Sequence, residues 1–219
     1  MSIQEWFSLI GNLSQFLLVL LGLFVFVQIK VAKDAFKTQC ERDALTKSAD
    51  LAHYFAQDII PKIDDYYRGL KVEGFASTPL ELSSFCRDDI KLLSKDQQEK
   101  CQKDFNFYSK NKLLRAKCIY VFNDFEALAI NFTKLIADEK VLFTALSQSY
   151  CGFIEKNYAI LCLIRKTKHD LYYVNTIDLY KEWSKKIKLN GLLVEKRGVD
   201  EKVAEMNKEC YNRYTPKGV

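Results

Sequence analysis

The stretch FSLIGNLSQFLLVLLGLFVFVQI, residues 7–29, decides how this chain is built. From Phe16 to Val27 it carries no polar side chain. A helix rises about 1.5 Å per residue, so residues 7–29 are long enough to cross a hydrocarbon core of about 30 Å. The sequence therefore predicts one transmembrane helix within residues 1–29.

A cleaved secretory signal is the alternative interpretation of this stretch. Such a signal needs a basic segment before the apolar run and a small-residue cleavage site after it. No Lys or Arg lies before Trp6, and the run ends in Val-Gln-Ile-Lys. Both features favour a retained membrane helix.

The charges on the two flanks predict its orientation. Glu5 is the charged residue before the span, whereas five basic residues follow it: Lys30, Lys33, Lys37, Arg42 and Lys47. Because cytoplasmic flanks carry an excess of Lys and Arg, we expect the C-terminal domain in the cytoplasm. The seven cysteines are irregularly spaced and form no C-x-x-C, which predicts reduced thiols, several in the core, and no metal site or cofactor.

The rest of the chain has the pattern of a helical protein. Its 8 Gly and 3 Pro are too few for the turns of an all-β fold. Apolar residues recur at helical spacing from the membrane onward, so we expect a stalk over residues 30–68, kinked or bounded near Pro61, and an all-α domain over residues 69–219. Thr78 and Ser94 open expected capping boxes, Asp138 caps a third helix, and Gly191 ends a later one. The expected helices cover residues 78–93, 94–108, 110–136, 138–150, 151–164, 177–188 and 200–213.

Three features support a resemblance to known proteins. Residues 122–130 have the pattern aromatic-N-x-aromatic-E-x-x-A-x-x-I, Asp138 and Glu139 follow, and Leu179 to Trp183 form L-x-x-x-W. With the N-terminal span, these resemble a bacterial family that pairs one membrane helix with a helical domain long catalogued as of unknown function. The overall plan is also similar to that of the membrane effectors of the Hailong anti-phage system. Those effectors are channels held shut by short DNA oligomers made by a partner nucleotidyltransferase.

The resemblance implies a cellular location and a function. It implies a single-pass protein of the bacterial inner membrane that harms the infected cell through a channel or lesion. It also implies an anionic ligand, a short single-stranded DNA or a nucleotide made by a partner enzyme. Because one helix does not enclose a pore, we expect a homo-oligomer and take a tetramer as the working subunit number. No family motif assigns a binding residue.

Small and polar residues mark one face of the membrane helix. At about 100° per residue, five of them share a face: Ser8, Gly11, Asn12, Gln15 and Gly22. Polar side chains in a bilayer are unfavourable unless they meet other helices or water. This face therefore predicts a helix–helix interface or the lining of a pore; snorkelling of the outermost residues to the interface is the third interpretation.

Basic residues in the domain are the candidates for binding an anionic ligand. Two groups stand out, one with Lys112 and Arg115 and one with Arg165, Lys166 and Lys168, which Tyr172 and Tyr173 follow. Cations bind phosphates and aromatic faces stack on bases, so such groups suit nucleotides or single strands. A solvated helix face is the alternative interpretation. The net charge of +5 is compatible with either.

Other chemistry-bearing residues have structural interpretations. Lys181, Lys185, Lys186 and Lys188 are expected at a helix C-terminus, where cations complement the helix dipole. Glu126 lies in an apolar stripe and is expected to pair with a Lys, Arg or Tyr of another helix. Known nucleotide-binding and hydrolase motifs are absent from the sequence, so we expect no enzyme. The rival function is a membrane-anchored adaptor that recruits a protein partner without forming a pore.

Overall fold

The computed structural model describes residues 3–214, with side chains described between residues 14 and 207 and at a few positions before. Its first and longest element is helix α1, Ile3–Tyr54. The other elements follow in chain order: a π-helical turn η1 (Phe55–Ile59), α2 (Ile60–Val72), α3 (Arg87–Ile90), α4 (Lys95–Lys110), α5 (Lys112–Thr133), α6 (Glu139–Lys156), α7 (Tyr158–Ile164) and α8 (Val174–Tyr214). The described residues contain no strand, which confirms the all-α prediction.

The chain divides into two compact units, residues 1–47 and 48–219. In the first unit every described side chain from residue 14 to residue 43 is exposed. This helix is long and apolar enough to cross a membrane. The second half of the expected stalk belongs to the second unit, because Leu51, Phe55, Ile59 and Ile63 enter its core.

Pro61 marks a boundary, as predicted. The π-helical turn Phe55–Ile59 ends just before it, and Pro61 lies in the first turn of α2. Proline has no N–H to donate and fits the first turn of a helix, whereas further inside it would displace the preceding turn. The wider π turn takes up this irregularity while Phe55 and Ile59 remain buried, at 3 % and 0 % exposed.

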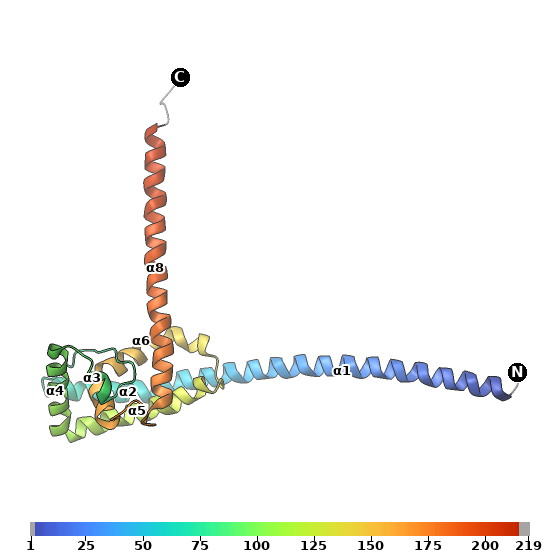
Figure 1. The fold of residues 1–219 in the computed structure, drawn as a ribbon, viewed down its shortest axis with the longest axis horizontal. Coiled ribbons are helices and arrows are strands. Elements are labelled where there is room, and N and C mark those ends of the chain that lie inside the picture. Colours follow the sequence, from blue (N-terminus) through green and yellow to red (C-terminus); the bar gives the residue numbers. More distant parts are fainter. Residues whose placement is uncertain (1–2, 215–219) are drawn as a thin grey trace. The chain divides into compact units, whose positions relative to one another are not determined.

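Helices α5, α6 and α8 form the centre of the second unit (Figure 1). Helix α8 packs across α5 and α6, α2 packs along α5, and α4 packs on α7 and α5. Aromatic rings fill the centre: Phe125 lies 4.5 Å from Tyr150, and Tyr150 lies 5.2 Å from Trp183, between ring centroids. Rings of this size supply much of the buried apolar area that stabilises a small helical domain.

A buried polar cluster ties α2, α4 and the start of α7 together. The Tyr66 hydroxyl donates to the side-chain oxygen of Asn157 and accepts from the Tyr108 hydroxyl at 2.7 Å; the Tyr108 hydroxyl also lies 3.3 Å from the same Asn157 oxygen. Asn157 in turn donates to the backbone oxygen of Phe153. All three cluster side chains are fully buried, and because each finds a partner, burial leaves none of them unsatisfied.

Two predicted helix signals are confirmed. Ser94 and Gln97 form the capping box at the start of α4, and the Asp138 side chain accepts from the backbone N–H of Lys140 at the start of α6. Cys86, Cys101, Cys118, Cys151 and Cys162 are buried free thiols, as expected of small core residues.

Three other predicted boundaries are wrong. The break expected between residues 150 and 151 lies at Asn157, because α6 continues to Lys156. The Thr78 capping box does not form, and residues 75–86 are irregular, because tertiary contacts hold them: the Leu80 backbone N–H donates to the Glu155 carbonyl at 3.0 Å, and Leu82 is buried. Gly191 does not end a helix, since α8 continues to Tyr214. A single Gly disfavours a helix by only about 1 kcal/mol, which strong helix formers on both sides offset.

Candidate functional site

The described side chains of the apolar part of α1 are not buried within their own unit. Phe26 is 72 % exposed and Leu18 67 %. A Cβ added at Gly22 would meet no atom within 4 Å. Of the predicted polar face, Gln15 and Gly22 are exposed; the side chains of Ser8, Gly11 and Asn12 lie outside the described residues. The described part of the face is therefore uncovered within its own unit.

The predicted anion-binding residues lie on two different elements. Lys112 and Arg115 belong to the first turn of α5, with Lys112 exposed and Arg115 half-buried. Lys166 and Lys168 are exposed in the segment between α7 and α8. Within the described residues, no ion pair or side-chain hydrogen bond joins the two groups.

Arg165 has a structural environment. Its side chain is 3 % exposed, and its guanidinium donates to the backbone carbonyl of Tyr172, while its Nε has no partner. The backbone carbonyl of Arg165 also accepts from the N–H of Arg87 at 3.3 Å. This burial argues against direct contact with a ligand and indicates a role in holding the loop of residues 165–173.

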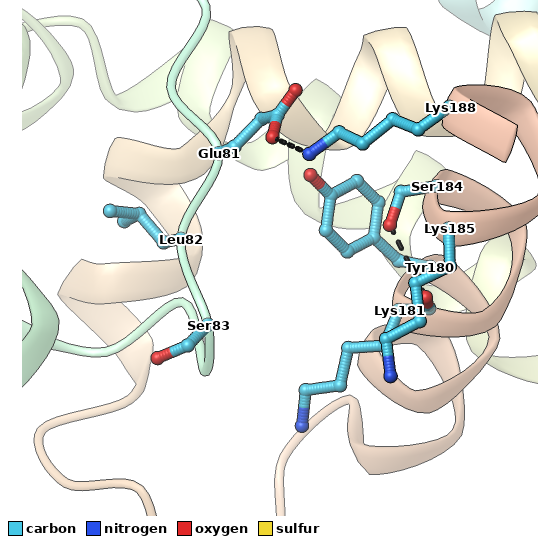
Figure 2. A pocket seen from close by; sticks show the side chains of 8 residues that line it. All are labelled: Glu81, Leu82, Ser83, Tyr180, Lys181, Ser184, Lys185 and Lys188. Carbon is cyan, nitrogen blue, oxygen red and sulfur yellow. Dashed lines mark hydrogen bonds and ion pairs between the residues drawn. The ribbon is translucent and has the colours of Figure 1, made fainter. Parts of the chain in front are cut away.

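A basic pocket on α8 is the strongest candidate site on the domain. A cavity of about 410 Å³ lies between the irregular segment at residues 81–83 and one face of α8 (Figure 2). The spacing of residues 181, 184, 185 and 188 places them on one face of the helix. The lining residues are Glu81, Leu82, Ser83, Tyr180, Lys181, Ser184, Lys185 and Lys188.

Positive charge predominates in this pocket. Lys188 is ion-paired with Glu81 across it, and Lys181 lies 3.7 Å from Asp178 on its own helix. Lys185 has no ion-pair partner among the described side chains. Figure 2 shows Lys188 at the Glu81 end and Lys181 and Lys185 at the other. Three ammonium groups against one lining carboxylate leave a positive field at the open end.

The lysines were expected at a helix C-terminus, and that explanation is wrong. Helix α8 continues past them to Tyr214, so residues 181–188 lie in its first half. The unpaired backbone carbonyls of a helix C-terminus, which cations would complement, are therefore not found beside these lysines. Their recurrence at helical spacing was visible in the sequence, but the opposing wall at residues 81–83 was not. That wall is the part of the chain for which the sequence predicted a helix.

A second, smaller cavity of about 170 Å³ adjoins the first and shares Glu81, Ser184 and Lys188 with it. Glu155 lines it and accepts from the Tyr180 hydroxyl at 2.9 Å. Burial raises the pKa of the Glu155 carboxyl above its usual range; the Tyr180 hydrogen bond opposes this shift, Glu81 adds to it, and Lys188 lowers the pKa. The carboxylates of Glu81 and Glu155 thus lie at one end of the double cavity, whereas Lys185, which has no ion pair among the described side chains, lies at the other.

Ammonium groups around an open cavity suit an anionic ligand such as a phosphate group. The hydroxyls of Ser83 and Ser184 donate instead to Asp89 and to the backbone carbonyl of Lys181. No cluster of potential metal ligands occurs among the residues that the structure describes. Comparison with protein-family models, curated protein sequences and solved structures finds no match for this chain. Over the residues that the structure describes, fold and site define an all-α protein with one candidate membrane helix and a basic pocket on its helical domain.

Proposed function

We propose that this protein is a homo-oligomeric single-pass effector of the bacterial inner membrane that acts in anti-phage defence. Its membrane helices would form an ion channel or lesion, and its cytoplasmic domain would control it by binding an anionic ligand such as a short DNA oligomer. The observation that carries the proposal is the exposed apolar surface of α1, on which every described side chain from residue 14 to residue 43 lacks cover.

Exposed apolar surface on this scale supports a membrane location. Each Å² of apolar surface removed from water contributes roughly 25 cal/mol, so a row of exposed Leu, Val and Phe is strongly unfavourable in water. A bilayer covers this surface on all sides, and the helix satisfies its own backbone hydrogen bonds there. Gln15 and Gly22 break the apolar surface on one face, which supports contact with other copies or with water.

The basic pocket supports the ligand-controlled part of the proposal. Lys181 and Lys185 offer ammonium groups around a cavity large enough for a phosphate-bearing group. A nucleotide or short single strand matches this chemistry. The proposal assigns no catalytic step to the chain.

The decisive experiment replaces the membrane helix. One variant carries a polyleucine helix in place of residues 7–29, and a control keeps Ser8, Gly11, Asn12, Gln15 and Gly22 in the same leucine background. Planar-bilayer conductance and toxicity in cells should be lost in the first variant and retained in the control. Toxicity that is retained equally in both variants without conductance, or the absence of conductance from the natural protein with and without short DNA, would exclude the channel.

A membrane-anchored adaptor is the second candidate function. The observation that favours it is the distal part of α8, where apolar side chains are exposed over several turns, among them Leu192 at 64 % and Met206 at 66 %. An adaptor would retain its activity with the polyleucine helix, whereas a channel would not. The same experiment therefore separates the two functions.

A further inference from the structure

The distal part of α8 carries an apolar stripe that its own domain does not cover. Helix α8 continues to Tyr214, and every described residue from 188 to 207 is exposed except Gly198, which is half-buried. Six positions recur along it with alternating steps of three and four, and all but Lys196 hold large apolar residues. Those on the stripe are Leu189, Leu192, Val199, Val203 and Met206, each between 49 % and 66 % exposed.

This spacing is a heptad repeat. Leu189, Lys196 and Val203 occupy successive a positions, and Leu192, Val199 and Met206 occupy the d positions. Gly191 and Gly198 both fall at c positions on the outer face, where no atom lies within 4 Å of an added Cβ. The residues that weaken a helix are thus kept away from the stripe. Leu193 flanks the stripe at an e position, and Val194 lies on the outer face.

We propose that this stripe, residues 189–206, packs against the same stripe of a second copy as an antiparallel two-stranded coiled coil. The inference is independent of the proposed channel, because it concerns a surface outside the membrane helix. In this arrangement Leu189 faces Met206 of the second copy, Leu192 faces Val203, and Lys196 faces Val199. The overlap is about 27 Å long at 1.5 Å per residue.

The charges select the antiparallel orientation. In a parallel pair, Lys196 would lie against Lys196 of the second copy, and Glu195 would lie beside Asp200; both contacts are repulsive. In the antiparallel pair, Lys196 lies against Val199, along which its methylenes extend. Glu195 and Lys202 of the second copy are both g positions, which lie on the same side of an antiparallel pair, so the two side chains lie within two residues of each other along the axis. Symmetry repeats this contact, so two attractive pairs replace the repulsive ones.

A second copy fits the stripe better than an unrelated partner does. The stripe is complementary to itself when reversed, both in its apolar layers and in the pairing of Glu195 with Lys202. A two-fold axis between Lys196 and Val199 produces all these contacts at once. Binding of a partner of different sequence would not require the stripe to be complementary to itself.

Site-specific disulfide cross-linking of the full chain in membranes tests the proposal, because it is blind to association through the membrane helix. In a background with Cys40→Ser and Cys210→Ser, Leu192→Cys and Val203→Cys are introduced into two differently tagged copies that are expressed together. The proposal expects mixed 192–203 dimers and few 192–192 or 203–203 dimers. The opposite distribution would establish a parallel pair. The absence of cross-links at both positions would overturn the proposal that the stripe packs against a second copy.

A charge exchange supplies the second measurement. Glu195→Lys alone, or Lys202→Glu alone, should lower the cross-linked yield about fivefold, since two attractive contacts become repulsive. The two variants mixed together should recover the natural yield, because each mixed pair restores opposite charges at both contacts. In a parallel pair Glu195→Lys would instead raise the yield by facing Asp200. Val194→Asn, on the outer face, is the control that should change nothing, whereas Val199→Asn should lower the yield.

Discussion

The carboxylate of Glu126 on α5 holds Thr176 in the first turn of α8 by two hydrogen bonds. Its Oε2 accepts from the backbone N–H of Thr176 at 2.8 Å and from the hydroxyl at 2.7 Å. Its Oε1 accepts from the backbone and side-chain amides of Asn175. A carboxylate at a helix N-terminus satisfies N–H groups that lack intrahelical partners and complements the dipole. Glu126 thus fixes the start of the helix that carries both the basic pocket and the heptad stripe.

Replacing Glu126 should destabilise the domain. Glu126→Ala leaves the buried Thr176 without an acceptor, and we expect the free energy of unfolding to fall by about 2–3 kcal/mol. Glu126→Gln should be milder because its amide oxygen still accepts. Thermal unfolding of the full chain in detergent, followed by circular dichroism, measures both. Glu99→Ala, at an exposed position of α4, is the matched control; an equal effect there would refute the capping role.

Glu126 also shows where prediction from the sequence stops. Its place in an apolar stripe correctly indicated a structural carboxylate, but the expected partner was a cationic or phenolic side chain. The observed partners are backbone and side-chain groups at Asn175 and Thr176, about fifty residues away in the chain. No local spacing encodes that contact, because it exists only once α8 crosses α5.

The helix boundaries also differ according to whether local sequence or tertiary contacts determine them. The capping box at Ser94 and the cap at Asp138 are made by neighbours in sequence, so local patterns predicted them. The similar pattern at Thr78 failed, because Leu82 and Phe85 are buried against the core and hold their segment out of a helix. The basic pocket depends on that segment, so its lysines could not be assigned to a pocket from local patterns.

The end of α5 offers a stabilising substitution. Leu135 has a φ of 55°, its N–H bonds to the Phe132 carbonyl at 3.0 Å, and the N–H of Ile136 bonds to the Asn131 carbonyl at 2.8 Å. This is a Schellman motif, in which the left-handed position normally holds Gly. Leu135 is 89 % exposed, so its side chain contributes little packing. Leu135→Gly should raise the free energy of unfolding by about 1 kcal/mol, measured by thermal unfolding; Ile136→Gly, next to it, should lower it.

The buried pair of Asp104 and Tyr158 makes stability depend on pH. The Tyr158 hydroxyl donates to Asp104 Oδ2 at 2.7 Å, and Asp104 is 6 % exposed. Burial raises the pKa of the Asp104 carboxyl, which the Tyr158 hydrogen bond partly offsets. The folded state therefore binds this proton more tightly than the unfolded chain does. Stability from this group is present at low pH and is lost as pH rises from about 4, the ordinary pKa, through the raised value.

Asp104→Asn isolates this contribution. The amide oxygen still accepts from Tyr158 but does not titrate, so the variant should gain stability relative to the natural protein as pH rises from about 4 to 7. Denaturant unfolding of both proteins across this range measures the difference, in which other titrating groups cancel. A difference that is constant with pH would show that the Asp104 pKa is the same in both states.

Lys185 provides the test of the basic pocket. Its ammonium lines the cavity without an ion pair among the described side chains, so Lys185→Ala should weaken binding of a labelled short single-stranded DNA about tenfold, the value of a charged hydrogen bond. The dependence of affinity on salt should also flatten, by about 0.7 in logarithmic slope for each phosphate that is no longer bound. Lys103→Ala, exposed on α4, is the control for removal of charge alone.

Parallel measurements on Lys112→Ala and Lys168→Ala decide between this pocket and the residues that the sequence suggested. Both lysines are exposed, on α5 and on the segment after α7, so neither substitution should disturb the fold. Unchanged affinity in Lys185→Ala with weaker binding in Lys168→Ala would move the site to the segment after α7. A uniform small decrease in every variant would reduce the interaction to nonspecific attraction between a basic domain and an anion, because such attraction depends on total charge and not on position.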